Sequence, residues 1–560
     1  MCLCGGKFNE RSLCVFEAGT VIYFYLRHSV DHQKIAKALF IAGCVLCMLQ
    51  VWLPAYYLTG DGPCHVYNAR ILHDLWIGKD NSFYFRFYEV SHQPDPNWLS
   101  SIVIAALMFV VKGVMAEKVY LTIYVALYVS GFFLLLKKIS NNAPYWPLVI
   151  FVFVFTHALS KGFYNFSFSI AFYFWVVWAW LRFLDRSTVV KGLLFLLFVA
   201  LAFFTHLLSF AFSVFTCAAL VVSYAIAKER EGERPGIFFL RYAGWLALLV
   251  APFLALMIAF TEKQGGLQLH LGLHKDRIKD LLEFRYIINM DLAEKPYTIL
   301  AGVVLLILLA ISGIVYLRRL RINKYDGFIV SLLLVVFVYF CFPEEFLGRL
   351  ILISLRVQLF VFIMAVCCIS YLLPSAKVRN GAGVALFGCF AALGIIRLAC
   401  LQRAAEGVAD YTSALSYIKP HSVVLPLDFC PNGRDKNGQY IADANWLFSH
   451  ASEYMGAEKP MIILDNYEAN MGYFPLSWKE GVNPYHHLST GNGIEGQPPG
   501  ADIAGYKNIS GVSIDYILVW CYDEKEGDGA FEKLQAAINA GYHQVYASPL
   551  QRTILFEKNK

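Results

Sequence analysis

Long apolar runs separated by short polar segments fill the first 400 residues of the chain. From 192 to 227 there is no Asp, Glu, Lys or Arg, and the only histidine is His206. A helix needs about 20 residues to cross the hydrocarbon core of a bilayer, so this run predicts two crossings that meet near His206. In all we predict eleven spans, at about 36–57, 119–136, 146–159, 165–181, 190–205, 207–227, 237–260, 297–317, 326–342, 357–373 and 382–401.

The distribution of lysine and arginine predicts the orientation of these spans. If the short apolar stretch 98–111 does not cross, the clusters rich in Lys and Arg all fall on one side, which the positive-inside bias assigns to the cytoplasm. The connections on the opposite side are poorer in positive charge, except the loop 262–296, which carries six Lys or Arg. The clusters are Lys34 and Lys37; Lys137 and Lys138; Arg182, Arg186 and Lys191; Lys228, Arg230, Arg234 and Arg241; Arg318, Arg319, Arg321 and Lys324; Lys377 and Arg379.

The hydrophobic pattern changes near residue 403. Four short apolar segments, 422–429, 461–464, 516–520 and 553–556, predict buried strands, and 530–540 predicts a helix. Gly, Pro and Asn separate them, as is typical of turns. We therefore expect an α-helical polytopic membrane protein with a cytoplasmic or interfacial N-terminus (1–35), a transmembrane domain (36–402) whose first external loop is 58–118, and an extracytoplasmic α/β domain (403–560).

Composition supports a membrane protein and excludes several other classes. The chain is 58% hydrophobic and only 16% charged, against about 25% charged in soluble domains. The net charge of +6 reflects basic loops and predicts no nucleic-acid partner. No phosphate-binding loop and no GxSxG motif occur, and the GxGxxG at Gly491 runs into Pro498, so it is read as a loop. The scattered cysteines predict neither a zinc site nor a disulfide framework.

The first external loop carries the strongest candidate for chemistry. Gly60, Gly62 and Pro63 predict a turn just after the first span, which would hold Asp61 at the membrane surface. A carboxylate in a partly dry site suits general-base work, whereas the alternative is that Asp61 only caps a following helix. Other candidates in this loop are His65, Tyr67, Asn68, Arg70, Glu89 and His92.

Further polar residues fall on the same predicted side of the membrane. Ionisable groups at membrane depth usually line a site or an aqueous cavity, and arginine can hold a phosphate with two parallel hydrogen bonds. The alternatives are a snorkelling Arg356 and a His206 that serves only the structure of a hairpin tip. The candidates are Lys161, Asn165, His206, Glu345, Arg349 and Arg356.

Over residues 36–400 the sequence resembles the C-type (GT-C) glycosyltransferase superfamily, which includes protein O-mannosyltransferases, aminoarabinose transferases and RgtA/B/C/D-like membrane enzymes. The resemblance rests on an acid at the start of a long first external loop, Asp61 in Gly60-Asp61-Gly62-Pro63-Cys64-His65, and on a late external loop from Gly348 to Arg356. It implies that Asp61 activates the acceptor or contacts a metal ion.

The expected activity is transfer of a monosaccharide from a polyprenyl-phosphate donor to an unidentified extracytoplasmic acceptor, which is a glycan, a lipid or a protein. Asp61 would be the base, His65 would orient the acceptor or contact the donor, and Arg349, Arg356 and Lys161 would bind the donor phosphate. We expect the inner (cytoplasmic) membrane as location, the bilayer as a partner and a divalent metal ion as the only candidate cofactor. The alternatives are a transporter or flippase of lipid-linked sugars and an envelope-assembly protein without catalysis.

The charge asymmetry makes a prediction about topology. A reporter enzyme fused after residue 403 should be active only in the extracytoplasmic compartment, because an odd number of spans separates it from a cytoplasmic N-terminus. A reporter fused after Lys138 provides the opposite control. Cytoplasmic activity of the fusion after residue 403 would require an even number of spans and would contradict the assigned sides.

Overall fold

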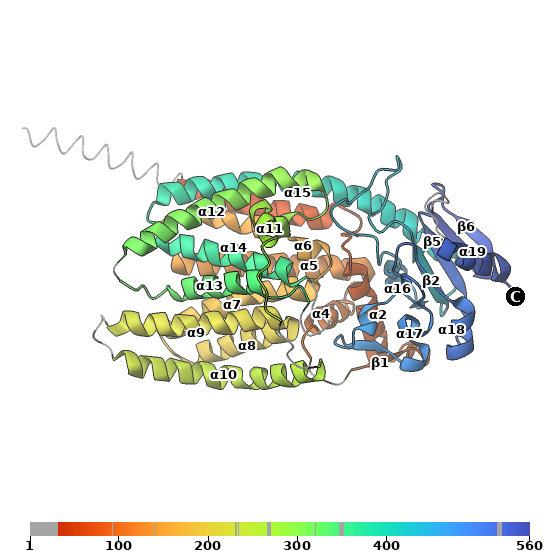
Figure 1. Cartoon of the computed structure of the whole chain (residues 1–560), viewed down its shortest axis with the longest axis horizontal. Helices are drawn as coiled ribbons and strands as arrows, with labels where there is room; N and C mark the ends of the chain where they lie inside the picture. Colours follow the sequence, from red (N-terminus) through yellow and green to blue (C-terminus); the bar gives the residue numbers. More distant parts are fainter. Residues whose placement is uncertain are drawn as a thin grey trace, which may run out of the picture.

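The computed structural model describes residues 32–560, apart from 92, 94, 141, 230–231, 233, 266–269, 320, 346–351 and 523–528. Long helices lie side by side along the longest axis of the molecule, and the C-terminal strands gather at one end of this bundle (Figure 1). The protein is therefore a polytopic helical membrane protein with a C-terminal domain that contains a sheet, as the apolar runs predict.

Eight helices within the described residues are long and apolar enough to cross a membrane. Three other predicted spans form shorter apolar helices: η1 with α6 (Trp146–Phe153 and His157–Ser160), α8 (Val189–Thr205) and α13 (Gly327–Cys341). The number of crossings therefore stays a prediction. The eight are His32–Trp52, α5 (Gly113–Ile139), α7 (Tyr164–Asp185), α9 (Leu207–Glu229), α10 (Pro235–Lys263), Leu292–Leu317 with α12 (Lys295–Arg318), α14 (Ile353–Leu372) and α15 (Ala376–Tyr411).

The stretch 98–111 forms only a short helix, α4 (Leu99–Leu107). At 1.5 Å per residue, nine residues extend about 14 Å, less than half of a hydrocarbon core of about 30 Å. The helix is held against the bundle by a hydrogen bond from the Trp98 amide to the Phe204 carbonyl (3.1 Å). It is too short to cross as a helix, which agrees with its assignment to the loop 58–118.

The basic clusters lie together at the end of the bundle away from the sheet. The α9–α10 and α12–α13 connections and the start of α15 all lie at that end (Figure 1). There Lys138 pairs with Asp185, the Tyr325 hydroxyl donates to the Lys138 carbonyl (3.1 Å), and Arg379 donates to the Ser140 hydroxyl (3.1 Å). The basic clusters that the sequence analysis assigns to one side of the membrane therefore lie at one end of the helical bundle.

The basic loop 262–296 lies at the other end, and half of its six cations have carboxylate partners. Arg277 on α11 (Arg277–Glu283) is buried, pairs with Glu344 (2.9 Å), and donates to the Phe342 carbonyl (2.7 Å). Three of the six cations of this loop are therefore held in ion pairs. The other pairs are Lys263 with Asp95 (2.7 Å) and Lys295 with Glu283 (2.9 Å).

The C-terminal domain is built on a five-stranded sheet of order β3-β2-β5-β7-β6. Strands β3, β2 and β5 are parallel, and β7 and β6 are antiparallel additions. The sequence predicts four of these strands and the helix α19 (Gly529–Gly541), but not β6, whose residues are mostly polar or half-exposed. The strands are β2 (Val423–Asp428), β3 (Ile462–Ile463), β5 (Tyr516–Trp520), β6 (Tyr542–Ala547) and β7 (Thr553–Lys558).

The loop 58–118 packs directly into the C-terminal domain. Strand β1 (Tyr88–Val90) of the loop pairs antiparallel with β4 (Leu476–Trp478). Helix α15 continues past the boundary expected at 402–403 and ends at Tyr411, so it also joins the two parts. The short elements of this layer are α2 (Gly62–Trp76), α3 (Asn81–Tyr84), η4 (Thr412–Tyr417), α16 (Glu453–Glu458), η5 (Glu468–Asn470), η6 (Glu480–Val482), α17 (Pro484–His487) and α18 (Ile503–Ser510), and the bundle adds η2 (Arg285–Ile287) and η3 (Leu292–Glu294).

Candidate functional site

A cavity of about 340 Å³ lies where the helical bundle meets the C-terminal domain. It brings together six residues that the sequence singles out from four separate segments. These are Asp61, His65, Lys161, Asn165, His206 and Arg356. The C-terminal domain contributes the opposite wall, with Asn445, Trp446, Ser449, His450, Tyr467, Glu468, Met471, Tyr473, Phe474 and Glu495.

Backbone contacts fix the position of Asp61. The amide of Gly60 donates to the Ser160 carbonyl (3.0 Å), and the amide of Asp61 donates to the Lys161 carbonyl (2.9 Å). Gly162 has φ +86°, and a Cβ added there would lie 2.3 Å from the Asp61 nitrogen. Only glycine permits both this conformation and this approach, so the first loop rests directly on the segment before α7.

The Asp61 side chain does not cap α2, although the residue occupies the N-cap position. Its carboxylate interacts with the Tyr467 hydroxyl instead, which lowers the pKa of Asp61. Burial, with the nearby Glu468 carboxylate, raises the pKa of Asp61 to about 6, and Tyr467, His65 and Lys161 oppose that rise. Asp61 is thus mostly ionised at neutral pH yet basic enough to accept a proton.

His65 lies between two hydrogen-bond acceptors. Its Nδ1 is 2.9 Å from the Glu468 carboxylate, and its Nε2 is 3.0 Å from the Gly162 carbonyl. Burial lowers the pKa of His65, but Glu468, Asp61 and the Gly162 carbonyl outweigh burial and raise it. Oxygen atoms beside both nitrogens favour the doubly protonated ring, whose positive charge offsets the two carboxylates.

Arg356 is buried beside the cavity without an acidic partner. Its guanidinium lies over the Phe163 ring (4.4 Å to the centroid), and Nη1 is 3.1 Å from His206 Nε2. Among the residues that the structure describes, no carboxylate lies within ion-pair distance of Arg356, and its Nε has no hydrogen-bond partner. Its placement is therefore not that of a snorkelling arginine, and a buried unpaired cation favours an anionic ligand.

Three other cavity residues have distinct surroundings. Burial and the Arg356 charge lower the pKa of His206 well below its usual value, so the ring is neutral. Burial also lowers the pKa of Lys161, whose Nζ donates to the Asn445 side chain (3.3 Å). Asn165 accepts from the Ser100 amide (3.0 Å), so it positions the start of α4.

Several sequence candidates lie away from the cavity. Tyr67 donates to the Met461 carbonyl (2.8 Å), Asn68 donates to Glu468 (2.8 Å), and Arg70 donates to the Ala457 carbonyl (3.2 Å). All three therefore attach α2 to the C-terminal domain. Glu89 and Glu345 are exposed and do not line the cavity, and His92 and Arg349 lie outside the described residues.

The sequence analysis did not single out Glu468 and Glu495, which line the cavity, or Glu117, which contacts the cavity residue Tyr164. Glu117 of α5 is fully buried and accepts hydrogen bonds from the hydroxyls of Tyr164 (2.5 Å) and Tyr454 (2.8 Å). An ionisable residue in an apolar run is a signal that could have drawn attention to Glu117. Glu468 and Glu495 carry no such signal, because they lie in an ordinary polar region of the C-terminal domain.

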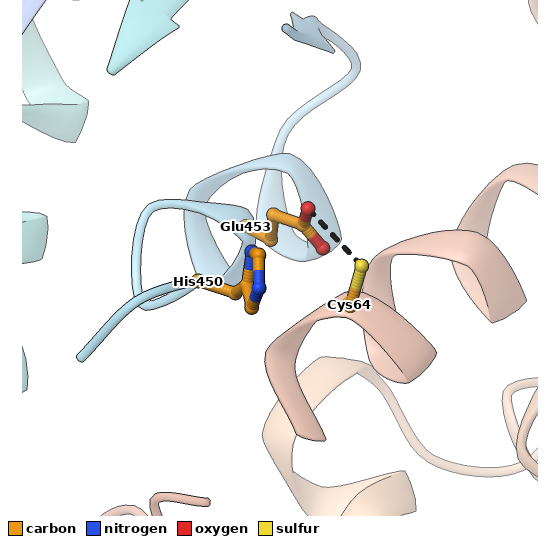
Figure 2. A group of neighbouring side chains, drawn as sticks. All are labelled: Cys64, His450 and Glu453. Atoms are coloured by element: carbon orange, nitrogen blue, oxygen red, sulfur yellow. Dashed lines mark hydrogen bonds between the residues drawn. The ribbon is translucent and has the colours of Figure 1, made fainter. Parts of the chain in front are cut away.

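One group of side chains near the cavity has the composition of a metal site. Among the described residues, Cys64, His450 and Glu453 are the only set of three or more His, Cys, Asp or Glu whose ligand atoms all lie within 4.8 Å of one another (Figure 2). Asp61, which the resemblance relates to a metal ion, is not in this set. The arrangement therefore does not place a metal ion on Asp61.

No protein-family model matches the chain, and no curated protein matches it. The functional argument therefore rests on the geometry of the cavity.

The close approach at Gly162 makes a prediction about stability. Gly162→Ala should destabilise the protein by at least about 1–3 kcal/mol, because alanine must adopt a positive φ and its Cβ would overlap the Asp61 backbone. Thermal unfolding in detergent measures the effect. Gly388→Ala on α15 is the matched control, since no heavy atom lies within 4 Å of its added Cβ, and it should be neutral or stabilising. Equal melting temperatures for the two variants would contradict the backbone contact.

Proposed function

We propose that the protein is a membrane glycosyltransferase of the C type, which moves a monosaccharide from a polyprenyl-phosphate donor to an extracytoplasmic acceptor. The observation that carries this proposal is one cavity that holds both a buried carboxylate, Asp61, and a buried arginine, Arg356, neither of them in an ion pair among the described residues. Such a cavity supplies a base and an anion site side by side.

The position and size of the cavity support a lipid-borne donor. Its volume of about 340 Å³ falls at the lower end of the range of about 300–1,000 Å³ for small-molecule sites. Arg356 lies in the first turn of α14, and Phe163 and Phe166 flank the start of α7, so the anion site is level with the ends of apolar helices. A phosphate at the end of a membrane-embedded chain would reach this level.

The proposed reaction assigns one role to each side of the cavity. Asp61 accepts the proton of the acceptor hydroxyl as that oxygen forms a bond to the anomeric carbon of the sugar. The bond between this carbon and the phosphate oxygen breaks, and its electron pair leaves with the polyprenyl phosphate. Arg356 and Lys161 stabilise the charge that develops on the phosphate. His65 limits the repulsion between Asp61 and Glu468.

The proposed location is the inner membrane, with eleven spans, a cytoplasmic N-terminus and the C-terminal domain outside. The support is the grouping of the basic clusters at the end of the bundle opposite the sheet, because such clusters are retained in the cytoplasm. The cavity then opens on the extracytoplasmic side, where no soluble nucleotide-sugar is supplied.

The first functional prediction concerns Asp61. Asp61→Asn should lower the rate of transfer by about 10²–10⁴, because asparagine keeps the size of the side chain but cannot accept the proton. Since the pKa of Asp61 is about 6, the wild-type rate should rise with pH and level off above that value. The measurement is single-turnover transfer from labelled polyprenyl-phosphate sugar at a series of pH values.

The exposed Asp276→Asn of the loop 262–296 is the control, and it should retain the wild-type rate and pH profile. Near-normal transfer by Asp61→Asn, or a wild-type profile that shows no change near pH 6, would remove Asp61 from the reaction.

The second functional prediction distinguishes an anion site from a structural arginine. Arg356→Ala should weaken donor use by about one to two decades, which corresponds to the loss of roughly 1.5–3 kcal/mol from a charge-assisted contact. Arg356→Lys should recover only part of the loss, because lysine supplies the charge without the two-pronged geometry. Donor titration in detergent gives the apparent KM and kcat.

The partly exposed Arg403, paired with Asp291 (3.6 Å) on the surface, provides the matched control Arg403→Ala. The same assay also tests the alternative function, because detergent removes the two compartments that a flippase needs. If no glycosylated product forms, and vesicles show movement of the sugar-lipid across the membrane, the proposed glycosyltransferase activity is wrong.

A further inference from the structure

Cys64, His450 and Glu453 meet at the boundary between the first external loop and the C-terminal domain. Cys64 lies on the first turn of α2, His450 lies in the segment before α16, and Glu453 begins α16. Their side chains face one another in a small space (Figure 2). The Cys64 thiol donates to a Glu453 oxygen at 3.2 Å, and all three residues are at most 5% exposed.

Two polar atoms of this group have no hydrogen-bond partner. Nδ1 of His450 and Oε2 of Glu453 are both buried and unsatisfied. Leaving such an atom unsatisfied costs about 1–3 kcal/mol, and more when the group is charged. The His450 ring is held in place by stacking on Tyr467, with the centroids 4.8 Å apart. The group is therefore ordered but incomplete as it stands.

We propose that Cys64, His450 and Glu453 bind one transition-metal ion of the zinc type. Thiolate, imidazole and carboxylate are the three ligand classes that Zn²⁺ uses in proteins. Ligands at about 2.0–2.3 Å in tetrahedral geometry lie roughly 3.3–3.8 Å from one another, so atoms already within 4.8 Å need only small rotations. Three protein ligands leave one position of the ion for a fourth ligand.

The charges of the group fit a divalent cation. A thiolate and a carboxylate together carry two negative charges, which Zn²⁺ would neutralise in a buried place. The carboxylates of Asp465 and Glu468 lie nearby and add to the negative charge around Glu453.

The metal ion would join parts of the chain that are far apart in sequence. Cys64 belongs to the first external loop, whereas His450 and Glu453 belong to the C-terminal domain. Cys64 is also three residues from Asp61, and His450 lines the same cavity as Asp61. Loading of the metal would thus stabilise the contact between the two parts, whatever reaction the cavity performs.

The test is the metal content of the full-length protein purified in detergent, measured by plasma mass spectrometry after incubation with Zn²⁺ and desalting. We expect about one zinc per chain, and its loss in Cys64→Ser, His450→Gln and Glu453→Gln. Cys400→Ser is the matched control, because Cys400 is equally buried but donates to the Ile441 carbonyl (3.0 Å). Zinc that is absent from the wild type, or retained in all three variants, would overturn the proposal.

A second measurement needs only the wild-type protein, in case the variants do not fold. The protein is stripped with a chelator, and alkylation of each cysteine is followed by peptide mapping with and without Zn²⁺ or Co²⁺. The ion should slow alkylation of Cys64 at least about tenfold and leave Cys400 unchanged, since a coordinated thiolate is a weaker nucleophile. With Co²⁺, a sulfur-to-cobalt absorption band should appear. Equal alkylation rates and no such band would refute the site.

Discussion

The contact between the turn at Gly60–Gly62 and the segment Ser160–Gly162 is the constraint on which the site depends. Two backbone hydrogen bonds join these segments, and the absence of side chains at Gly60 and Gly162 lets the chains approach. The backbone of Asp61 is therefore held in place by main-chain atoms. Because the second segment leads directly into α7, Asp61 is fixed relative to the helical bundle.

This constraint separates the charges of the cavity into two groups. The bundle and its connecting segments supply the cations Lys161 and Arg356, whereas the C-terminal domain supplies the carboxylates of Glu468 and Glu495. Asp61 lies at the boundary between the groups. In the proposed reaction the phosphate would therefore lie against the bundle, beside Lys161 and Arg356, and the acceptor hydroxyl would lie near Asp61.

The sequence predicts what depends on local pattern. Apolar runs predict the long helices, and the Gly-Asp-Gly-Pro turn directs attention to Asp61. The resemblance, through the late loop from Gly348 to Arg356, and the presence of a charged residue at membrane depth direct attention to Arg356. Tyr467 and Glu468 could not be found in this way, because they reach Asp61 and His65 only after about 400 residues of chain have folded. The same holds for the pairing of β1 with β4 and for the meeting of Cys64 with His450, since neither pair shares a local motif.

Helix α15 is a rigid connection between the helical bundle and the sheet of the C-terminal domain. Its 36 residues span about 54 Å at 1.5 Å per residue, well beyond a hydrocarbon core of about 30 Å. The remainder continues without a break to the sheet of the C-terminal domain (Figure 1). Helices tilt to match the thickness of the bilayer, and a tilt of α15 would swing that sheet as a lever. Because Tyr411 at the end of α15 packs on Trp520 of β5, with the ring centroids 4.6 Å apart, the sheet would move with the helix.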